Sequence, residues 1–370
     1  MRILALSHAA VVDVNQEPFH ELARAGADVT LVVPKALDTD IRGRVELAEL
    51  PGFAGELVGL DVAIGGFRKV LGGQRGIHLI VYHGLGEAVE RARPDLVFVE
   101  EEPYSAAALQ AARAAGKVRA PFVVHENQNI VRVLPPPFEA MRKAVLARAG
   151  GVTVRSKSAE FLVRALGFGG PIGPFPHGVD PSRYESAAIV DLPAPVIGFV
   201  GRLVPEKGLI DLIVAIEQAG TGSLLVVGDG PQLEAARERA HAIPSVFTGA
   251  IPHEDVPAWY GAMDVVVVPS RTTETWMEQF GRIVIEANAA GKPVVVTSSG
   301  ELPHTVQATG GGLVVPEGDV GALADAIAAL TRDAGLRERL GAAGRAAVAE
   351  RFTPRAIARE LLGFLEGIAR

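Results

Sequence analysis

The stretch DVVVVPSRTTETWMEQFGRIVIEANAAGKPVVVTS, residues 264–298, contains one complete strand–helix–strand unit. Its two apolar segments, 265–270 and 293–298, are short and built mainly of valine, which is typical of strands buried on both faces. Between them, the segment that opens near Phe280 has the periodicity of a helix. Because two parallel strands need such a crossover, the stretch predicts a parallel sheet with helices on its faces.

The same alternation of strand and helix recurs along the chain. Expected strands lie at 2–7, 28–34, 95–100, 121–126 and 151–156 in the first half, with helices such as 104–116 and 138–148, and at 196–201, 223–228, 246–249, 265–270, 293–298 and 312–316 in the second. The chain has 370 residues, and single cores stop growing at about 250–300 residues. We predict an α/β fold of two Rossmann-like parallel-sheet domains, 1–185 and 186–352, joined within the Gly/Pro-rich stretch 170–196 and followed by an amphipathic helix at 353–370.

Composition excludes several classes of protein. Hydrophobic residues make up 48% and charged residues 21%, which indicates a globular chain. The net charge of −7 gives no basic surface for nucleic acid, and the absence of cysteine excludes disulfides and thiolate-bound metals. No apolar run approaches the roughly 20 residues that span a bilayer. The N-terminal segment 1–14 resembles a first strand and not a secretory leader, so we expect a cytoplasmic protein.

A candidate phosphate site follows the strand at 196–201. The sequence GRLVPEKG places Gly201, Arg202 and Lys207 between the end of a strand and the start of a helix. A guanidinium fork, an ammonium group and unpaired helix amides together suit a diphosphate. The alternative is a solvated basic turn in which Glu206 pairs internally.

Two further loops follow strands of the same predicted sheet. Gly228 and Gly230 permit a tight turn, which fits ligand contact and a plain βα turn equally well. After the strand at 265–270 come Glu278, the helix opening Phe280, Gly281 and Arg282, and then Glu286. The helix amides can bind phosphate, Glu286 ribose hydroxyls and Glu278 sugar hydroxyls. The alternative is an acid near a helix N-terminus followed by an ordinary solvated helix glutamate.

These motifs, in this order and spacing, resemble the large retaining glycosyltransferase family 4 of GT-B architecture. The match consists of G-R-L-x-x-E-K-G, V-G-D-G-P and E-x7-E after a P-S loop, within residues 196–300. The resemblance implies that Arg202 and Lys207 bind the donor diphosphate, Glu286 the ribose and Glu278 the transferred sugar. It also implies that no metal or other cofactor is needed, that the two domains face each other across a cleft, and that the terminal helix returns to the N-terminal domain.

The N-terminal half matches this family less well. Family members often carry a glycine-rich loop after the first strand, whereas this chain has SHAAVVDVN at 7–15. Ser7 and His8 still end a strand, where His8 can contact a ligand or serve as a cap. His125 ends another strand, and the family commonly has a histidine here that reaches the donor sugar. The alternative for His125 is a hydrogen-bonded histidine at a strand end.

Acidic and amide side chains mark the predicted acceptor side. They are Glu100, Glu101 and Glu102 after one strand and Glu126, Asn127, Gln128 and Asn129 after another. Arg142, Lys143 and Arg148 allow at most a weak peripheral contact with a membrane. We predict a hexosyltransferase that takes its sugar from a UDP or GDP donor and passes it to a small-molecule, glycan or lipid-linked acceptor hydroxyl. A nucleotide-sugar epimerase and an inactive sugar-nucleotide binding module are the alternatives.

Overall fold

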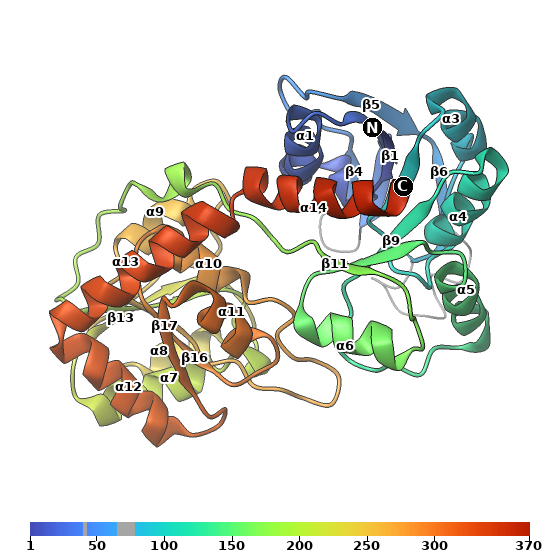
Figure 1. The fold of residues 1–370 in the computed structure, drawn as a ribbon. Helices are drawn as coiled ribbons and strands as arrows, with labels where there is room; N and C mark the ends of the chain where they lie inside the picture. The colour runs from blue at the N-terminus through green and yellow to red at the C-terminus, as the bar shows by residue number, and fades with distance from the viewer. Residues whose placement is uncertain (40–42, 65–77) are drawn as a thin grey trace. The chain divides into compact units, whose positions relative to one another are not determined.

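The computed structural model describes residues 1–39, 43–64 and 78–370, which form two compact units. Unit 1 comprises Met1–Pro176 together with Pro354–Arg370, and unit 2 comprises His177–Thr353 (Figure 1). The chain passes from one unit to the other inside the Gly/Pro-rich stretch, between Pro176 and His177, and not between residues 185 and 186 as the sequence analysis placed it.

Unit 1 is built on a seven-stranded parallel sheet in the order β11-β10-β9-β8-β1-β2-β5. The strands are β1 (Arg2–Leu6), β2 (Asp28–Pro34), β5 (Glu56–Leu60), β8 (Leu96–Val99), β9 (Phe122–Glu126), β10 (Gly151–Val154) and β11 (Ile172–Pro174). Two small antiparallel pairs, which the sequence did not predict, are β3 (Ala36–Thr39) with β4 (Gly43–Glu46), and β6 (Val62–Ile64) with β7 (Ile80–Tyr82). The carboxyl ends of β1, β8 and β9 therefore lie at one edge of the sheet.

Helices cover both faces of this sheet. One core cluster joins the sheet to α3 (Leu85–Ala92), α4 (Ala106–Val118), α5 (Pro136–Leu146) and α6 (Lys157–Ala165). The other joins it to α1 (Glu17–Arg24) and the C-terminal α14 (Pro354–Ala369). The two helices predicted at 104–116 and 138–148 correspond to α4 and α5.

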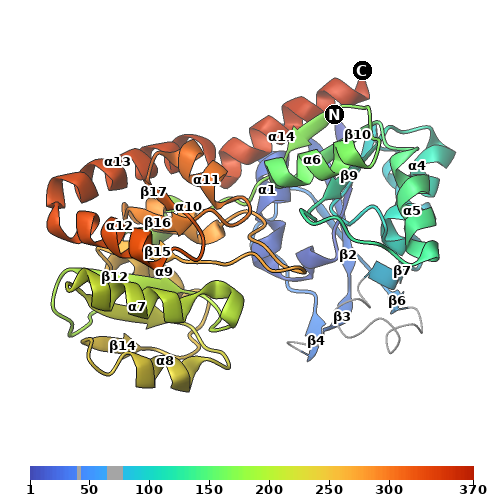
Figure 2. The ribbon, with the colours of Figure 1, turned by 90° about the horizontal axis from the view of Figure 1, so that it is seen from below.

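The C-terminal helix α14 completes the second face of the unit 1 sheet. Ile357, Leu361 and Leu365 are buried in the same cluster as Phe19 and Leu22 of α1. Figures 1 and 2 both show α14 lying beside α1. The apolar face of the predicted terminal helix is thus buried against a strand-and-helix layer that begins more than three hundred residues earlier in the chain.

Unit 2 contains a six-stranded parallel sheet in the order β14-β13-β12-β15-β16-β17, with β14 at one edge (Figure 2). All six strands predicted for this half are present: β12 (Val196–Val200), β13 (Ser223–Val227), β14 (Ser245–Phe247), β15 (Val265–Val268), β16 (Val294–Thr297) and β17 (Gly312–Val315). The helices are α7 (Leu209–Ala219), α8 (Leu233–Arg239), α9 (Val256–Gly261), α10 (Arg282–Ala289), α11 (Leu302–Thr309), α12 (Val320–Arg332) and α13 (Ala334–Arg351).

The valine-rich strands of unit 2 bury alternate residues in two different cores. Leu224 and Val226 of β13 pack with α7, α8 and α12, whereas Leu225 and Val227 pack in the core of α9, α10, α11 and α13. Each strand therefore needs apolar residues at successive positions, because both faces of the sheet are covered. This confirms the α/β fold with two Rossmann-like parallel sheets.

Candidate active site

Three loops of unit 2 leave the same edge of the sheet. β12 lies between β13 and β15, and all three strands are parallel. The loops that begin at Gly201, Gly228 and Pro269 therefore emerge side by side, at the edge where open α/β sheets bind ligands. All the unit 2 residues singled out from the sequence lie on these loops or on the helix that follows the third one.

Lys207 and Glu278 form an ion pair across two of these loops. The ammonium group of Lys207 donates a hydrogen bond to Oε1 of Glu278, and Ser270 Oγ donates to the same oxygen over 2.8 Å. The ring of Trp276 lies 4.7 Å from the Lys207 ammonium. Glu206 forms no ion pair with the described residues, so the internal partner of the basic turn is Glu278 and not Glu206.

Glu286 is buried on α10 and both of its oxygens are engaged. Tyr260 OH of α9 donates a hydrogen bond of 2.7 Å to Oε2, and the Arg282 guanidinium lies 2.8 Å from Oε1 in an ion pair. Only 6% of the residue is exposed. Glu286 is therefore not an ordinary solvated helix glutamate.

Two further features of this edge carry positive charge. Arg202 is exposed, and its guanidinium has no hydrogen bond or ion pair with the described residues. Helix α10 begins at Arg282, slightly later than the expected start near Phe280, because Gly281 occupies the N-cap with a left-handed φ of 77°. No described side chain caps the helix, so its first backbone N–H groups can donate hydrogen bonds to an anion.

Gly228 has a structural role at this edge. A Cβ atom added at Gly228 would lie 2.0 Å from the carbonyl oxygen of Gly201, and its φ of 140° is one that L side chains rarely adopt. Glycine is thus required for the loops after β12 and β13 to approach each other. This close packing explains the glycine without any ligand contact.

In unit 1, His8 follows β1 and Glu101 follows the neighbouring strand β8, and the two residues contact each other. Glu101 Oε1 accepts a hydrogen bond of 2.8 Å from the His8 backbone N–H, and Oε2 lies 2.7 Å from His8 Nδ1. Burial lowers the pKa of His8, but the carboxylates of Glu101, Glu100 and Glu102 raise it by more, so the pKa lies above its usual value of 6.5. Beside this pair, Ser7 Oγ donates to Glu100.

Glu102 and Glu126 share a hydrogen bond between their carboxyl groups. Burial, followed by the neighbouring charge of Glu102, raises the pKa of Glu126 well above its usual value of 4.5, which favours a proton within this pair. Burial likewise raises the pKa of Glu102. Sharing a proton removes the repulsion that two buried carboxylates would otherwise suffer.

His125 is enclosed in unit 1. Its Nδ1 lies 3.1 Å from Thr153 Oγ1, its ring meets Phe175 edge-on at 5.4 Å, and Nε2 is buried without a hydrogen-bond partner among the described residues. Burial, followed by the charge of Arg155, lowers the pKa of His125 well below 6.5. The imidazole is therefore neutral, and a ligand reaches Nε2 only if the surrounding side chains move.

The basic residues of α5 are paired within the helix. Arg142 and Lys143 both form ion pairs with Glu139, and Arg148 donates to the carbonyl of Ala144. These pairs reduce the charge that α5 can offer to an anionic surface. Within the described residues, no helix combines the length and the apolar character needed to cross a bilayer.

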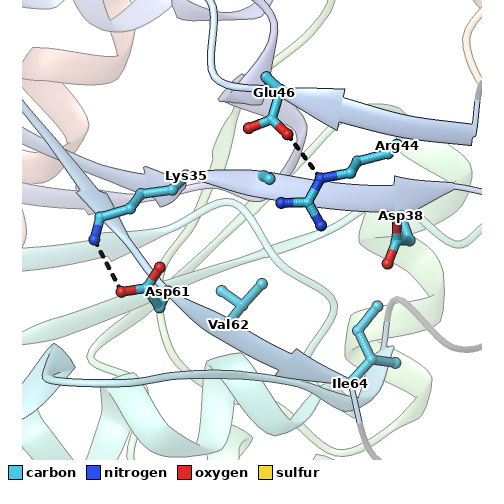
Figure 3. A pocket seen from close by; sticks show the side chains of 8 residues that line it. Lys35, Asp38, Arg44, Glu46, Asp61, Val62 and Ile64 are labelled. Atoms are coloured by element: carbon cyan, nitrogen blue, oxygen red, sulfur yellow. Dashed lines mark hydrogen bonds and ion pairs between the residues drawn. The ribbon is translucent and has the colours of Figure 1, made fainter.

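The described part of unit 1 includes a polar cavity and an aromatic one. One, of about 560 Å³, has walls on which Lys35 pairs with Asp61 and Arg44 pairs with Glu46 (Figure 3). Asp38 also lines it, so its carboxylates outnumber its cations, unlike an anion site. The other, of about 110 Å³, is lined by His78, Tyr104, Arg132, Val133, Leu134, Pro135 and Phe138. Tyr104 follows the acidic residues at the end of β8, so this aromatic cavity lies near the predicted acceptor side chains.

Sequence reasoning did not assign four side chains that hold these groups in place. Ser270 was part of the P-S motif but had no role, and Trp276 lay unremarked in the loop before Glu278. Arg155 follows β10, where its position at a strand end was a usable signal; it pairs with Glu100 and donates to Asn127 Oδ1 over 2.8 Å. Tyr260 gave no signal at all, because its contact with Glu286 depends on how α9 packs against α10.

In the described parts of the chain, no group of three or more His, Asp or Glu side chains is placed to hold a metal.

Solved structures share this fold. Sucrose-phosphate synthase from Thermosynechococcus elongatus aligns with a TM-score of 0.71 and 21% identity, over 100% of this chain and 99% of that one. The Anabaena protein HepE in complex with UDP aligns with a TM-score of 0.70 and 19% identity, over 99% and 100%. The fold is that of GT-B glycosyltransferases.

Sequence comparison places the chain within that class. A profile described as "Glycosyl transferases group 1" matches residues 185–347, and one described as "Glycosyl transferase 4-like domain" matches residues 13–176. The GDP-mannose-dependent alpha-(1-6)-phosphatidylinositol monomannoside mannosyltransferase of Mycobacterium tuberculosis H37Rv is 33% identical over 280 residues, 69% of this chain and 71% of the relative. The 2-deoxystreptamine N-acetyl-D-glucosaminyltransferase of Streptomyces fradiae is 31% identical over 326 residues, 80% and 72%. The chain is a glycosyltransferase and belongs to the glycosyl transferases group 1 family, that is, glycosyltransferase family 4.

Proposed function

We propose that this enzyme is a retaining, metal-independent hexosyltransferase whose unit 2 binds a UDP- or GDP-sugar and whose unit 1 binds the acceptor. The observation that carries the proposal is the grouping of Arg202, Lys207 and the uncapped start of α10 with the buried acids Glu278 and Glu286. Cations and helix amides suit a diphosphate, and carboxylates suit the hydroxyls of ribose and sugar.

The chemistry follows from where charge develops during transfer. As the anomeric carbon loses the diphosphate, negative charge builds on the leaving oxygens, and fixed positive groups lower the barrier. Arg202, Lys207 and the first amides of α10 supply that stabilisation. Glu278 orients the transferred sugar, and Glu286 holds the ribose. Retention is supported by the resemblance to the retaining family 4, in which acceptor attack and departure occur on the same face of the sugar.

Two features support the choice of ligands. One relative is described as GDP-mannose-dependent, and HepE was solved with UDP. Guanine and uracil are therefore the two nucleotide bases to test first. On unit 1, the polar strand ends and the neighbouring aromatic cavity of about 110 Å³ suit a hydroxylated acceptor with an apolar portion. Small molecules, glycans and lipid-linked sugars all fit this description.

A thermal-shift panel tests the donor assignment. UDP, GDP, ADP and their common sugar conjugates are compared with wild type, Glu286→Ala and the exposed control Glu338→Ala on α13. A ligand at about 100 times its dissociation constant adds about 2.7 kcal/mol of stability. We expect one nucleotide series to stabilise wild type and Glu338→Ala but not Glu286→Ala.

Other outcomes select among the alternatives. Stabilisation of all three proteins would place the nucleotide away from Glu286. Binding without nucleotide release in the presence of any acceptor would favour an inactive binding module. Conversion of the donor alone into an isomeric nucleotide sugar would favour an epimerase. Unchanged activity after chelation with EDTA is expected for a metal-independent transferase, and loss of activity would contradict that part of the proposal.

A further inference from the structure

His8 lies at the carboxyl end of β1, in the middle of the unit 1 sheet. The neighbouring strand β8 leads into Glu101, so the two side chains come from adjacent strand ends. His8 lies at the start of a short 3-10 turn, Ala9–Val11. The edge is the one at which parallel sheets bind their ligands.

Glu101 fixes both the position and the tautomer of this histidine. One carboxylate oxygen binds the His8 backbone N–H over 2.8 Å, and the other lies 2.7 Å from Nδ1. Since a carboxylate can only accept, Nδ1 carries the proton and Nε2 of the neutral ring is left with its lone pair. A base oriented by a third group in this way is the arrangement that proton transfer requires.

The two partners differ in exposure. The His8 side chain is 21% exposed and that of Glu101 only 2%. Nε2 has no hydrogen-bond partner among the described residues, whereas the carboxylate is enclosed and fully used. The imidazole is thus open to a ligand, and the group that orients it is not.

We propose that Nε2 of His8 accepts the proton of the acceptor hydroxyl during sugar transfer, with Glu101 as its positioning residue. This inference rests on the proposed function. The acceptor O–H bond breaks and its proton moves to Nε2, while the oxygen forms a bond to the anomeric carbon. The anomeric carbon–oxygen bond to the diphosphate breaks, and its electron pair leaves with the diphosphate. His8 then returns the proton to solvent.

The charged groups around His8 suit this task. Glu100 and Glu102 flank Glu101, Arg155 pairs with Glu100, and the buried Tyr82 hydroxyl is close enough for the charge of Glu101 to raise its pKa further than burial alone does. The carboxylates raise the pKa of His8 above 6.5, toward neutrality, where a general base works best. Activity should therefore rise with pH through the pKa of His8.

The first arm of the test needs no ligand. The histidine rings of wild type, Glu101→Gln and His304→Gln are isotope-labelled, and their nuclear magnetic resonance signals are followed from about pH 5 to about pH 9. His304 offers a matched control, since it lies 3.5 Å from Glu301 in a more exposed pair on unit 2. We expect the proton of neutral His8 on Nδ1 and a lower His8 pKa in Glu101→Gln. A proton on Nε2, or a pKa that Glu101→Gln leaves in place, would overturn the inference.

The second arm uses water as the acceptor. Nucleotide release from GDP-mannose and UDP-glucose is followed against pH for wild type, His8→Gln, Glu101→Gln and His304→Gln. We expect His8→Gln to lower kcat by about 100-fold, to lose the acidic limb and to leave the donor KM within about twofold. Glu101→Gln should move that limb to lower pH, and His304→Gln should match wild type.

The outcomes separate this inference from the proposed function. If wild type releases nucleotide and His8→Gln keeps both its kcat and its acidic limb, the role of His8 is refuted while the transferase assignment stands. If His8→Gln raises only KM, His8 binds a substrate and moves no proton. If wild type binds neither donor nor nucleotide in the thermal-shift panel, the proposed function fails, and the role of His8 fails with it.

Discussion

Replacing Trp276 with leucine should weaken binding of the nucleotide diphosphate. The Trp276 ring lies 4.7 Å from the Lys207 ammonium, and the Lys207 side chain is only 16% exposed. Cation–π contacts contribute about 0.5–1 kcal/mol at exposed sites and about 2 kcal/mol when desolvated. For this largely enclosed lysine we take about 1–2 kcal/mol, which corresponds to a dissociation constant about 5- to 30-fold higher.

Calorimetric titration with UDP or GDP, whichever stabilises the wild type, measures this change. Trp276→Phe keeps an aromatic face and should lose much less affinity than Trp276→Leu. The chain contains two tryptophans, so Trp259→Phe on α9 serves as the control and leaves Trp276 as the sole indole emitter. Binding of the nucleotide should then change the emission of Trp276.

Two results would refute this reasoning. If Trp276→Leu binds the nucleotide as tightly as wild type, the ring does not hold Lys207 for a phosphate. If Trp276→Phe is as weak as Trp276→Leu, the loss reflects loop packing and not the ring face. Thermal unfolding of each variant without ligand identifies any general loss of fold.

Three other predictions concern the packing and the buried carboxylates. Leu361→Ala on α14 removes a fully buried side chain and should cost about 2–5 kcal/mol in urea unfolding, with a smaller loss for the partly exposed Leu362→Ala; equal losses would contradict the packing of α14. Tyr260→Phe removes a hydrogen bond to the Glu286 carboxylate and should cost about 1.5–3 kcal/mol by the same measurement, and no loss would mean that the bond is unimportant. Since the pKa of Glu126 is raised on folding, its stabilising contribution is complete below its unfolded value near 4.5 and declines as pH rises toward the folded pKa. Unfolding measured against pH should show this decline in wild type and a flatter profile in Glu126→Gln, and parallel profiles would count against a proton held by Glu126.

The strands of unit 2 could be predicted because both faces of its sheet are buried. Residues 265–268 and 294–296 alternate between two apolar cores, which leaves no polar position to blur the pattern. Strand β5 of unit 1 was missed because it is an edge strand whose residues are mostly half-exposed, so its sequence ELVGL lacks a clear period. The division between the units was placed too late because Gly and Pro mark the whole stretch 170–196 equally.

The candidate site was predictable as a set of residue types but not as a set of pairs. Arg202, Lys207, Glu278 and Glu286 stand out because acids and bases follow strand ends in a fixed order. That Lys207 reaches Glu278, 71 residues away, depends on β12 and β15 being neighbours and on the rotamers of both side chains. The enclosure of His125 was equally out of reach, since it depends on Thr153 of β10 and on Phe175, which follows β11.

The pairing has a consequence for how a donor can bind under the proposed function. Lys207 and Arg282 are each held by a carboxylate, so Arg202 is the side-chain cation of this group that is open to an incoming diphosphate. If Lys207 moves toward a phosphate, the buried Glu278 carboxylate loses its ion pair with the ammonium group. This loss costs free energy unless another hydrogen-bond donor replaces Lys207. The hydroxyls of the transferred sugar can supply that donor, and the ribose hydroxyls can do the same for Glu286. A complete nucleotide sugar would therefore satisfy both halves of each ion pair, whereas a bare nucleotide would draw Lys207 from Glu278 without replacing it.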